Sequence, residues 1–248
     1  MGFMTIDGQR VEFTNEPNVL TVIRNAEIDI PTLCYHSELS IYGACRLCTV
    51  EDDRGKTFAS CAEPPRDGMV IYTNSPKVRN HRRNTVQLLL SQHDNRCVVC
   101  PRNGNCQLQQ VACDLNILDI PFRQEPEYQP WDKDFPLIRN SAKCIKCMRC
   151  VAICEKVQHC AVWDFTGVGP STKIIVRDNL PIAEAGCALC GQCITHCPTG
   201  ALTARDDVSL IMESILDPAV ETVVQVAPAV RTAWGEGLGL SREEATPG

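Results

Sequence analysis

Two dense runs of cysteine hold the residues of this chain that are best suited to chemistry. The runs span residues 144–154 and 187–197, and each has the spacing Cys-x2-Cys-x2-Cys-x3-Cys. Thiolates ligate zinc and iron–sulfur clusters. A structural zinc takes four ligands, usually as two separated pairs, whereas each run already crowds four thiols together. Disulfides are typical of small secreted chains. The spacing therefore favours iron–sulfur clusters over zinc or disulfides.

Both runs resemble those of bacterial two-cluster ferredoxins, and the second run ends in the typical Cys197-Pro198. In that pattern three thiolates of a run hold one [4Fe-4S] cluster, and the fourth holds the other cluster. We therefore expect Cys154 and Cys197 to cross between the runs. The expected ligands are Cys144, Cys147, Cys150 and Cys197 for one cluster, the first cube, and Cys187, Cys190, Cys193 and Cys154 for the other, the second cube.

Four cysteines near the N-terminus indicate another type of cluster. Their spacing, Cys-x10-Cys-x2-Cys-x12-Cys, has a longer first gap than the plant-type [2Fe-2S] pattern, so spacing alone leaves four buried thiols as an alternative. The segments 32–36 and 43–51 resemble the [2Fe-2S] domain of the complex I large iron–sulfur subunit and of multimeric [FeFe]-hydrogenases. The resemblance implies one [2Fe-2S] cluster with the ligands Cys34, Cys45, Cys48 and Cys61.

A helix is expected over residues 77–92, and its apolar periodicity continues to His93, which would lie on the same face. Three cysteines follow this histidine. Their spacing, His-x3-Cys-x2-Cys-x5-Cys, also suits a zinc site with three cysteines and one histidine. The same two families have a [4Fe-4S] site with this pattern, which implies the ligands His93, Cys97, Cys100 and Cys106. A neutral imidazole ligand is expected to raise the reduction potential, as it does in Rieske centres.

Composition sets wider limits. With 248 residues, 44% hydrophobic and 22% charged, the chain is expected to be globular, with one to three domains. Its 17 cysteines and an N-terminus without a secretory pattern favour metal ligation over disulfides. A net charge of −6 argues against nucleic acid as a partner, and no apolar stretch reaches the roughly 20 residues of a membrane span. We expect a soluble, cytoplasmic protein.

The expected fold class is α+β. A hairpin over residues 3–13, turning at Asp7-Gly8, precedes a helix that starts near Pro17, as in a β-grasp ferredoxin. Strands are expected near residues 161–165 and 173–176, and a helix and the strand 222–226 in the tail. The expected domains are a β-grasp [2Fe-2S] domain (1–78), a small helical His/Cys3 cluster domain (79–120), a linker (121–137), a two-[4Fe-4S] ferredoxin-like domain (138–205) and a helix-strand tail (206–248).

These assignments leave Cys113, in a segment 107–118 expected to be helical, and Cys160 without a cluster. No cysteine follows Cys197, so the cluster that activates hydrogen has no ligands of its own here. The sequence also lacks a Rossmann glycine fingerprint, a phosphate loop and an acid–base or nucleophile constellation. We therefore expect a non-catalytic subunit whose flavin and nicotinamide sites lie on partners.

Taken together, the motifs resemble the N-terminal iron–sulfur region of the large subunit of NAD-linked, electron-bifurcating [FeFe]-hydrogenases, without its catalytic domain. The resemblance implies an electron-transfer subunit with an FMN- and NAD(H)-binding diaphorase subunit and a small thioredoxin-like [2Fe-2S] subunit as partners. A further partner would be a formate dehydrogenase, a transhydrogenase, a reductase or ferredoxin. The [2Fe-2S] and His93 clusters are expected to face the diaphorase, and the paired cubes the second partner. The alternatives are the N-terminal fragment of a hydrogenase and a zinc-stabilised scaffold.

Overall fold

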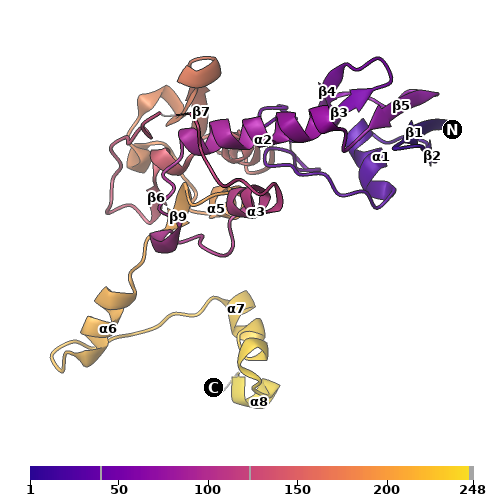
Figure 1. Cartoon of the computed structure of the whole chain (residues 1–248). Helices are drawn as coiled ribbons and strands as arrows, with labels where there is room; N and C mark the ends of the chain where they lie inside the picture. The colour runs from indigo at the N-terminus through magenta and orange to yellow at the C-terminus, as the bar shows by residue number, and fades with distance from the viewer. Residues whose placement is uncertain (40, 123, 246–248) are drawn as a thin grey trace. The chain divides into compact units, whose positions relative to one another are not determined.

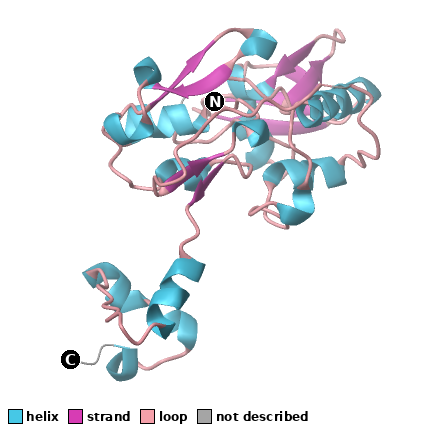
Figure 2. Cartoon of the chain, turned by 90° about the vertical axis from the view of Figure 1, so that its left-hand side faces the viewer, coloured by secondary structure: helices cyan, strands magenta, loops and turns pink. Residues whose placement is uncertain are grey.

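The structure is a computed structural model that describes residues 1–39, 41–122 and 124–245. The chain divides into two compact units, Met1–Arg205 (unit 1) and Asp206–Gly248 (unit 2). Short helices and strands joined by long loops make up unit 1, and the described part of unit 2 consists of short helices and loops, as Figure 2 shows. The expected mixture of helices and strands is confirmed.

A five-stranded sheet forms the N-terminal part of unit 1. Strands β1 (Gly2–Ile6) and β2 (Gln9–Phe13) form the expected hairpin. Its turn residues Asp7 and Gly8 have φ angles of 50° and 85°, the left-handed conformation that a two-residue hairpin turn requires. The sheet order is β2-β1-β5-β3-β4, with β1 and β5 parallel and the other pairs antiparallel. The remaining strands are β3 (Thr49–Asp52), β4 (Thr57–Ala59) and β5 (Met69–Tyr72).

Helix α1 (Val19–Asn25) covers this sheet. It begins after Asn18, whose side chain accepts a hydrogen bond from the Thr21 backbone N–H and so satisfies one of the free donors of the first turn. The apolar residues of α1 pack with those of β1, β3 and β5 into one buried core. Two of the predicted cluster ligands, Cys48 and Cys61, belong to that core.

The longest helix, α2 (Pro76–Ser91), runs from beside β3 toward the part of unit 1 that carries β6 and β7 (Figure 1). Ser75 caps its N-terminus, and Pro76 occupies the first turn, where its missing N–H is not needed. The buried Arg82 guanidinium donates to the carbonyl oxygens of Leu47 and Thr49 and thereby ties α2 to the start of β3 and to the loop before it. The helix ends at Ser91, so His93 lies just beyond it rather than on its apolar face.

Helix α3 (Gln107–Asp114) packs against α2 and is shorter than the expected segment 107–118. The predicted linker contains no helix or strand over residues 124–136. Trp131 anchors it, because its indole stacks on Trp163 at a centroid distance of 5.8 Å and donates to the Leu137 carbonyl oxygen.

The second half of unit 1 is built from two small antiparallel sheets and two short helices. The strands expected near residues 161–165 and 173–176 are present as β7 and β8, while the other sheet joins the start of this half to its end. The elements are β6 (Leu137–Arg139), α4 (Arg149–Ala152), β7 (Trp163–Thr166), β8 (Lys173–Val176), α5 (Gln192–His196) and β9 (Leu202–Ala204).

Unit 2 carries the expected helix but not the expected strand. Residues 222–226 have no regular structure, because an isolated strand leaves its backbone groups without hydrogen-bond partners. Its helices are α6 (Val208–Leu216), α7 (Pro228–Ala233) and α8 (Arg242–Ala245). Within the described ranges, no helix of the chain is both long enough and apolar enough to cross a membrane.

Candidate metal centres

The ligands predicted for the first cube surround one cavity of about 20 Å³. Cys144 reaches it from the loop before α4, and Cys197 reaches it from the end of α5. Burial raises the pKa of the Cys147 thiol to about 12 and also raises the pKa of Cys150. Thiolates at this site therefore need a positive partner, which iron would supply if a cluster were held there. The wall includes Cys144, Cys147, Cys150 and Cys197.

The ligands predicted for the second cube surround a larger cavity, of about 250 Å³. Cys154 comes to it from the first cysteine run, and its Sγ accepts a hydrogen bond from the Val162 N–H at 3.3 Å. The fifth thiol on the wall is the unassigned Cys160. Cys154 thus lines the cavity formed by the second run, and Cys197 lines the cavity formed by the first run. The thiols lining the cavity are Cys154, Cys160, Cys187, Cys190 and Cys193.

The two cysteine runs share one backbone conformation. Lys146 and Leu189, which occupy matching places in the two runs, have φ angles of 57° and 54°. Met148 and Gly191, two residues further on, also match, at 66° and 70°. A positive φ is unfavourable for lysine, leucine and methionine. Alternating right- and left-handed residues turn successive backbone N–H groups toward one point, a concavity that suits anions and iron–sulfur clusters.

The four N-terminal cysteines are buried and associate in two pairs. The interaction between the side chains of Cys34 and Cys45 raises the pKa of Cys34 and lowers that of Cys45. Cys48 and Cys61 form the other pair, in which the pKa of Cys48 is lowered and that of Cys61 raised for the same reason. One thiol of each pair is therefore easily deprotonated, as metal binding requires.

The loop between α1 and β3 carries Cys34, Cys45 and Cys48, and the short turn after β4 carries Cys61. Backbone N–H groups of Leu33 and Cys45 donate to the sulfurs of Cys45 and Cys34, at 3.4 and 3.5 Å. Gly43, at the start of the cysteine loop, has a φ of 61°, which a glycine adopts without strain. The arrangement suits a cluster with two thiolates at each end.

His93 is buried, with an exposed fraction of 7%. Burial, and secondarily the nearby Lys143 ammonium, lower the pKa of the imidazole to about 4, so the ring is neutral at physiological pH. Its buried Nδ1 has no hydrogen-bond partner, which leaves a nitrogen free for a metal. The half-buried thiols of Cys97, Cys100 and Cys106 lie within electrostatic range of one another.

The side chains of the predicted ligands do not converge on one point as the ligands of a single metal ion do. Across the described parts of the chain, no three His, Cys, Asp or Glu side chains converge as the ligands of one metal ion do. The two cube cavities and the two N-terminal cysteine pairs are therefore the geometric features that bring the predicted ligands together.

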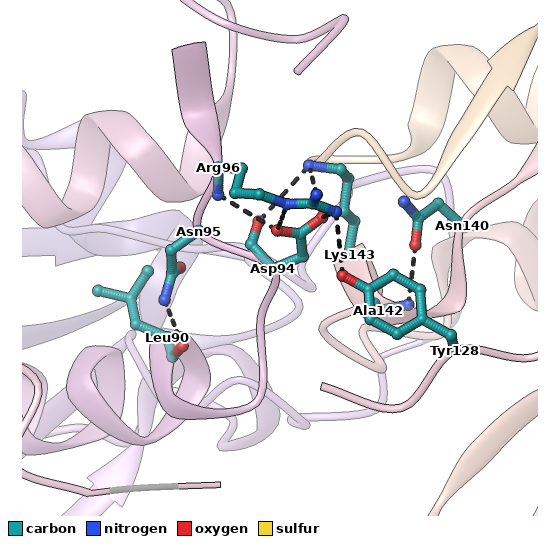
Figure 3. Close-up of polar contacts among 8 residues, drawn as sticks. All are labelled: Leu90, Asp94, Asn95, Arg96, Tyr128, Asn140, Ala142 and Lys143. Carbon is teal, nitrogen blue, oxygen red and sulfur yellow. Dashed lines mark hydrogen bonds and ion pairs between the residues drawn. The ribbon is translucent and has the colours of Figure 1, made fainter. Parts of the chain in front are cut away.

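A buried polar network beside His93 was not foreseen from the sequence (Figure 3). Asp94 receives two hydrogen bonds from the Arg96 guanidinium, at 2.8 and 2.9 Å, and these hold the pKa of its carboxyl well below the usual range. The Lys143 ammonium lies 3.5 Å from Asp94 Oδ2, and Arg96 also donates to the Tyr128 hydroxyl. The only sequence signals were the positions of Asp94 and Lys143, each next to a predicted ligand.

Residues of the predicted [2Fe-2S] and His93 sites contact residues of the first cube site. Cys34, Cys45 and Cys147 belong to one apolar cluster, in which Ile145 lies beside residues of α2 and α3. On the His93 side, the Gln107 N–H donates to the carbonyl oxygen of Pro198, the residue after Cys197, a predicted ligand of the first cube. Residues of the first cube site thus share contacts with residues of both the [2Fe-2S] site and the His93 site.

Comparison with known proteins agrees with this layout. Residues 3–76 match the family described as a 2Fe-2S iron-sulfur cluster binding domain. Residues 82–121 match the NADH-ubiquinone oxidoreductase-G iron-sulfur binding region, and residues 143–201 match the 4Fe-4S dicluster domain. These three families cover the sites in the order in which the sequence places them.

Among curated proteins, the chain is 38% identical to the NADP-reducing hydrogenase subunit HndD of Solidesulfovibrio fructosivorans, over 96% of this chain and 42% of that protein. It is 34% identical to the NADH-ubiquinone oxidoreductase 75 kDa subunit of Reclinomonas americana, over 81% of this chain and 29% of that protein. The chain thus spans less than half the length of these relatives.

Among solved structures, the crystal structure of an NAD+-reducing [NiFe]-hydrogenase in the H2-reduced state matches with a TM-score of 0.74 and 27% identity. The match covers 82% of this chain and 87% of that one. The chain therefore carries a [2Fe-2S] domain followed by [4Fe-4S] binding domains, and it resembles the iron–sulfur region of NAD(P)-linked hydrogenase subunits and of the complex I large iron–sulfur subunit.

Proposed function

We propose that this chain is an electron-transfer subunit of an NAD(H)-linked oxidoreductase complex. The observation that carries the proposal is the placement of two predicted cluster sites against the first cube site, within one compact unit. Electron transfer needs redox centres held close together in an ordered row, and this packing supplies such a row.

The proposed cofactors are one [2Fe-2S] cluster and three [4Fe-4S] clusters. The donor sets fit them, because each site offers four thiols or three thiols with a neutral imidazole. When bound, the clusters supply one-electron redox chemistry. The chain holds their ligands, donates backbone N–H groups to cysteine sulfurs, and excludes water with apolar walls. Hydrogen bonding and burial are the means by which a protein sets cluster potentials.

The proposed domain layout follows the sites: 1–78 for the β-grasp [2Fe-2S] domain, 79–120 for the His93 cluster, 121–137 for the linker, 138–205 for the paired cubes and 206–248 for the tail. Contacts support a route from the [2Fe-2S] site to the first cube, with the His93 site on a second face of that cube. The order expected from the sequence is simpler: the [2Fe-2S] and His93 clusters both precede the paired cubes. This route refines that order.

The proposed partners are an FMN- and NAD(H)-binding diaphorase subunit, a small thioredoxin-like [2Fe-2S] subunit, and a second oxidoreductase or ferredoxin. The names of the relatives support an NAD(P)H-linked complex. We further propose that the complex couples its reactions by flavin-based electron bifurcation. The alternative, the N-terminal part of an [FeFe]-hydrogenase large subunit, is favoured by the hydrogenase relative that matches across 96% of this chain.

Isolation of the native complex through a tag on this chain, under anaerobic conditions, tests the proposal. The expected complex contains a flavoprotein, and NADH bleaches the iron–sulfur absorbance of this chain. Recovery of this chain with a hydrogen-activating domain fused after residue 248 would establish the alternative. Clusters that NADH leaves oxidised in the presence of the flavoprotein would contradict both.

A further inference from the structure

Lys143 is a buried cation whose role is not explained by the ligand sets. Its side chain is only 8% exposed, and its ammonium lies 3.5 Å from both Asp94 Oδ2 and the Asp94 carbonyl oxygen (Figure 3). Removing an ammonium from water is costly unless it is well paired. The contact with Asp94 is a long one for an ion pair, because the same carboxylate is also bound by Arg96 in a bidentate manner.

Lys143 reaches from one cluster site to another. Its backbone directly precedes the first-cube ligand Cys144, and its carbonyl oxygen accepts a hydrogen bond of 2.7 Å from Thr199 Oγ1. Thr199 Oγ1 is also 3.7 Å from the sulfur of Cys197. A Cβ atom added at Gly200 would lie 3.5 Å from Lys143 Cδ and 2.8 Å from Cys100 Sγ, so the lysine stem passes close to the His93 site.

The ammonium acts electrostatically on that site. Burial lowers the pKa of His93 and raises that of Cys97; the Lys143 ammonium adds to the first shift and opposes the second, whereas Asp94 does the reverse. Asp94 contributes one negative charge, and Lys143 and Arg96 contribute two positive charges. The network is therefore cationic overall. Its buried members are Lys143 and Asp94, whose side chains are 8% and 5% exposed, whereas the Arg96 side chain is 69% exposed and screened by water. The buried cation that lies between the two cluster sites is therefore the lysine.

We propose that Lys143 is a tuning residue shared by two clusters, and that its fixed charge raises the reduction potentials of the His93 cluster and the first cube together. Reduction adds one negative charge to a cluster, so a nearby buried cation stabilises the reduced state. Asp94 and Arg96 act as positioning residues that hold the ammonium between the two sites. The inference rests on the proposed function, since it requires clusters at these sites.

The test is a potentiometric titration of the full chain with its clusters, followed by electron paramagnetic resonance, with iron content measured in parallel. Lys143→Met removes the charge and keeps the length of the side chain. We expect the equilibrium constant for reduction of both [4Fe-4S] clusters to fall roughly tenfold, which corresponds to about 59 mV for one electron. The [2Fe-2S] cluster serves as the internal reference and keeps its potential.

Two further variants separate charge from structure. Lys143→Arg keeps the charge, and we expect potentials near those of the unaltered chain. The double variant Lys143→Met/Asp94→Asn removes one charge of each sign, so the potentials should return toward their original values. The double variant also avoids a buried Asp94 carboxylate that has lost its lysine partner, which would be destabilising. If Lys143→Met alone loses iron, the potentials of the double variant test the proposal.

Unchanged potentials in an iron-replete Lys143→Met variant would overturn this inference alone. A double variant with potentials lower than those of Lys143→Met would also overturn it, because a structural defect accumulates whereas opposite charges cancel. Absence of iron from the unaltered chain would instead remove the proposed function, and this inference with it.

Discussion

The sulfur of Cys106 lies 3.8 Å from the carbonyl oxygen of Pro198. Cys106 is a predicted ligand of the His93 cluster, and Pro198 directly follows the first-cube ligand Cys197. The two sites come from regions 92 residues apart in sequence. The end of the second cysteine run thus contributes to two predicted sites, because Cys197 lines the first cube cavity and Pro198 contacts Cys106 of the His93 site.

The crossing of ligands between the runs can be tested with two cysteines on one cavity wall. Cys154 and Cys160 both line the second-cube cavity. We expect Cys154→Ser to remove or strongly alter the second cube, with a loss of up to about four irons per chain. Cys160→Ser should keep the full iron content. Iron analysis and paramagnetic resonance of both variants check this, and equal losses in the two would show that the ligand assignment is wrong.

Replacing His93 tests whether its neutral imidazole is a ligand of the cluster. His93→Cys puts an anionic thiolate in place of an imidazole, so the cluster should be retained with a potential lower by on the order of 100 mV, judging from Rieske centres. His93→Ala should lose the cluster. The matched control is Cys113→Ser, an exposed thiol on α3, which should change neither iron nor potential. If His93→Ala kept iron and potential, His93 would be an ordinary buried histidine.

Gly200 tests the contact between the His93 site and the first cube. A Cβ atom at this position would meet Cys100 Sγ at 2.8 Å, closer than real side chains approach. A cysteine bound to iron cannot move away, so Gly200→Ala should distort the resonance signal of the His93 cluster or remove up to about four irons. Gly237→Ala, where no atom lies within 4 Å, is the control. An unaltered signal in Gly200→Ala would place Cys100 elsewhere.

Arg82 tests how α2 supports the [2Fe-2S] site. Its guanidinium is buried and donates to the carbonyl oxygens of Leu47 and Thr49, on either side of Cys48. Arg82→Met leaves these carbonyls unpaired, and the temperature at which [2Fe-2S] absorbance is lost should fall by on the order of 5–10 °C. Arg79→Met, at an exposed position of the same helix, should leave this temperature within about 1 °C. Equal changes would mean that the two hydrogen bonds are unimportant.

Local chemistry explains what could be predicted from the sequence. Asp7-Gly8 specifies a two-residue hairpin turn, and β1 and β2 form there. Cysteine spacing predicts that ligands cross between the runs, and Cys154 and Cys197 line the cavities of the opposite runs, which supports that prediction. The strand 222–226 was wrongly predicted because β-branched residues favour a strand only where a partner strand is available.

Contacts between distant residues could not be predicted. The parallel pairing of β1 with β5 joins Met4 to Met69, and neither strand indicates its partner. Lys143 and Asp94 are 49 residues apart, and in the sequence each has the pattern of an ordinary solvent-exposed charged residue. Helical periodicity placed His93 on α2, yet the helix ends at Ser91, and His93 N–H then donates to the Leu90 carbonyl in a tighter turn.

Metal and acid-labile sulfide analysis of the full chain, prepared under anaerobic conditions, tests the central claim most directly. The account predicts about fourteen irons per chain, a brown protein, and paramagnetic signals on reduction from one [2Fe-2S] and three [4Fe-4S] clusters. Zinc held by the cysteines in a colourless protein, with little iron or sulfide after anaerobic preparation, would contradict it.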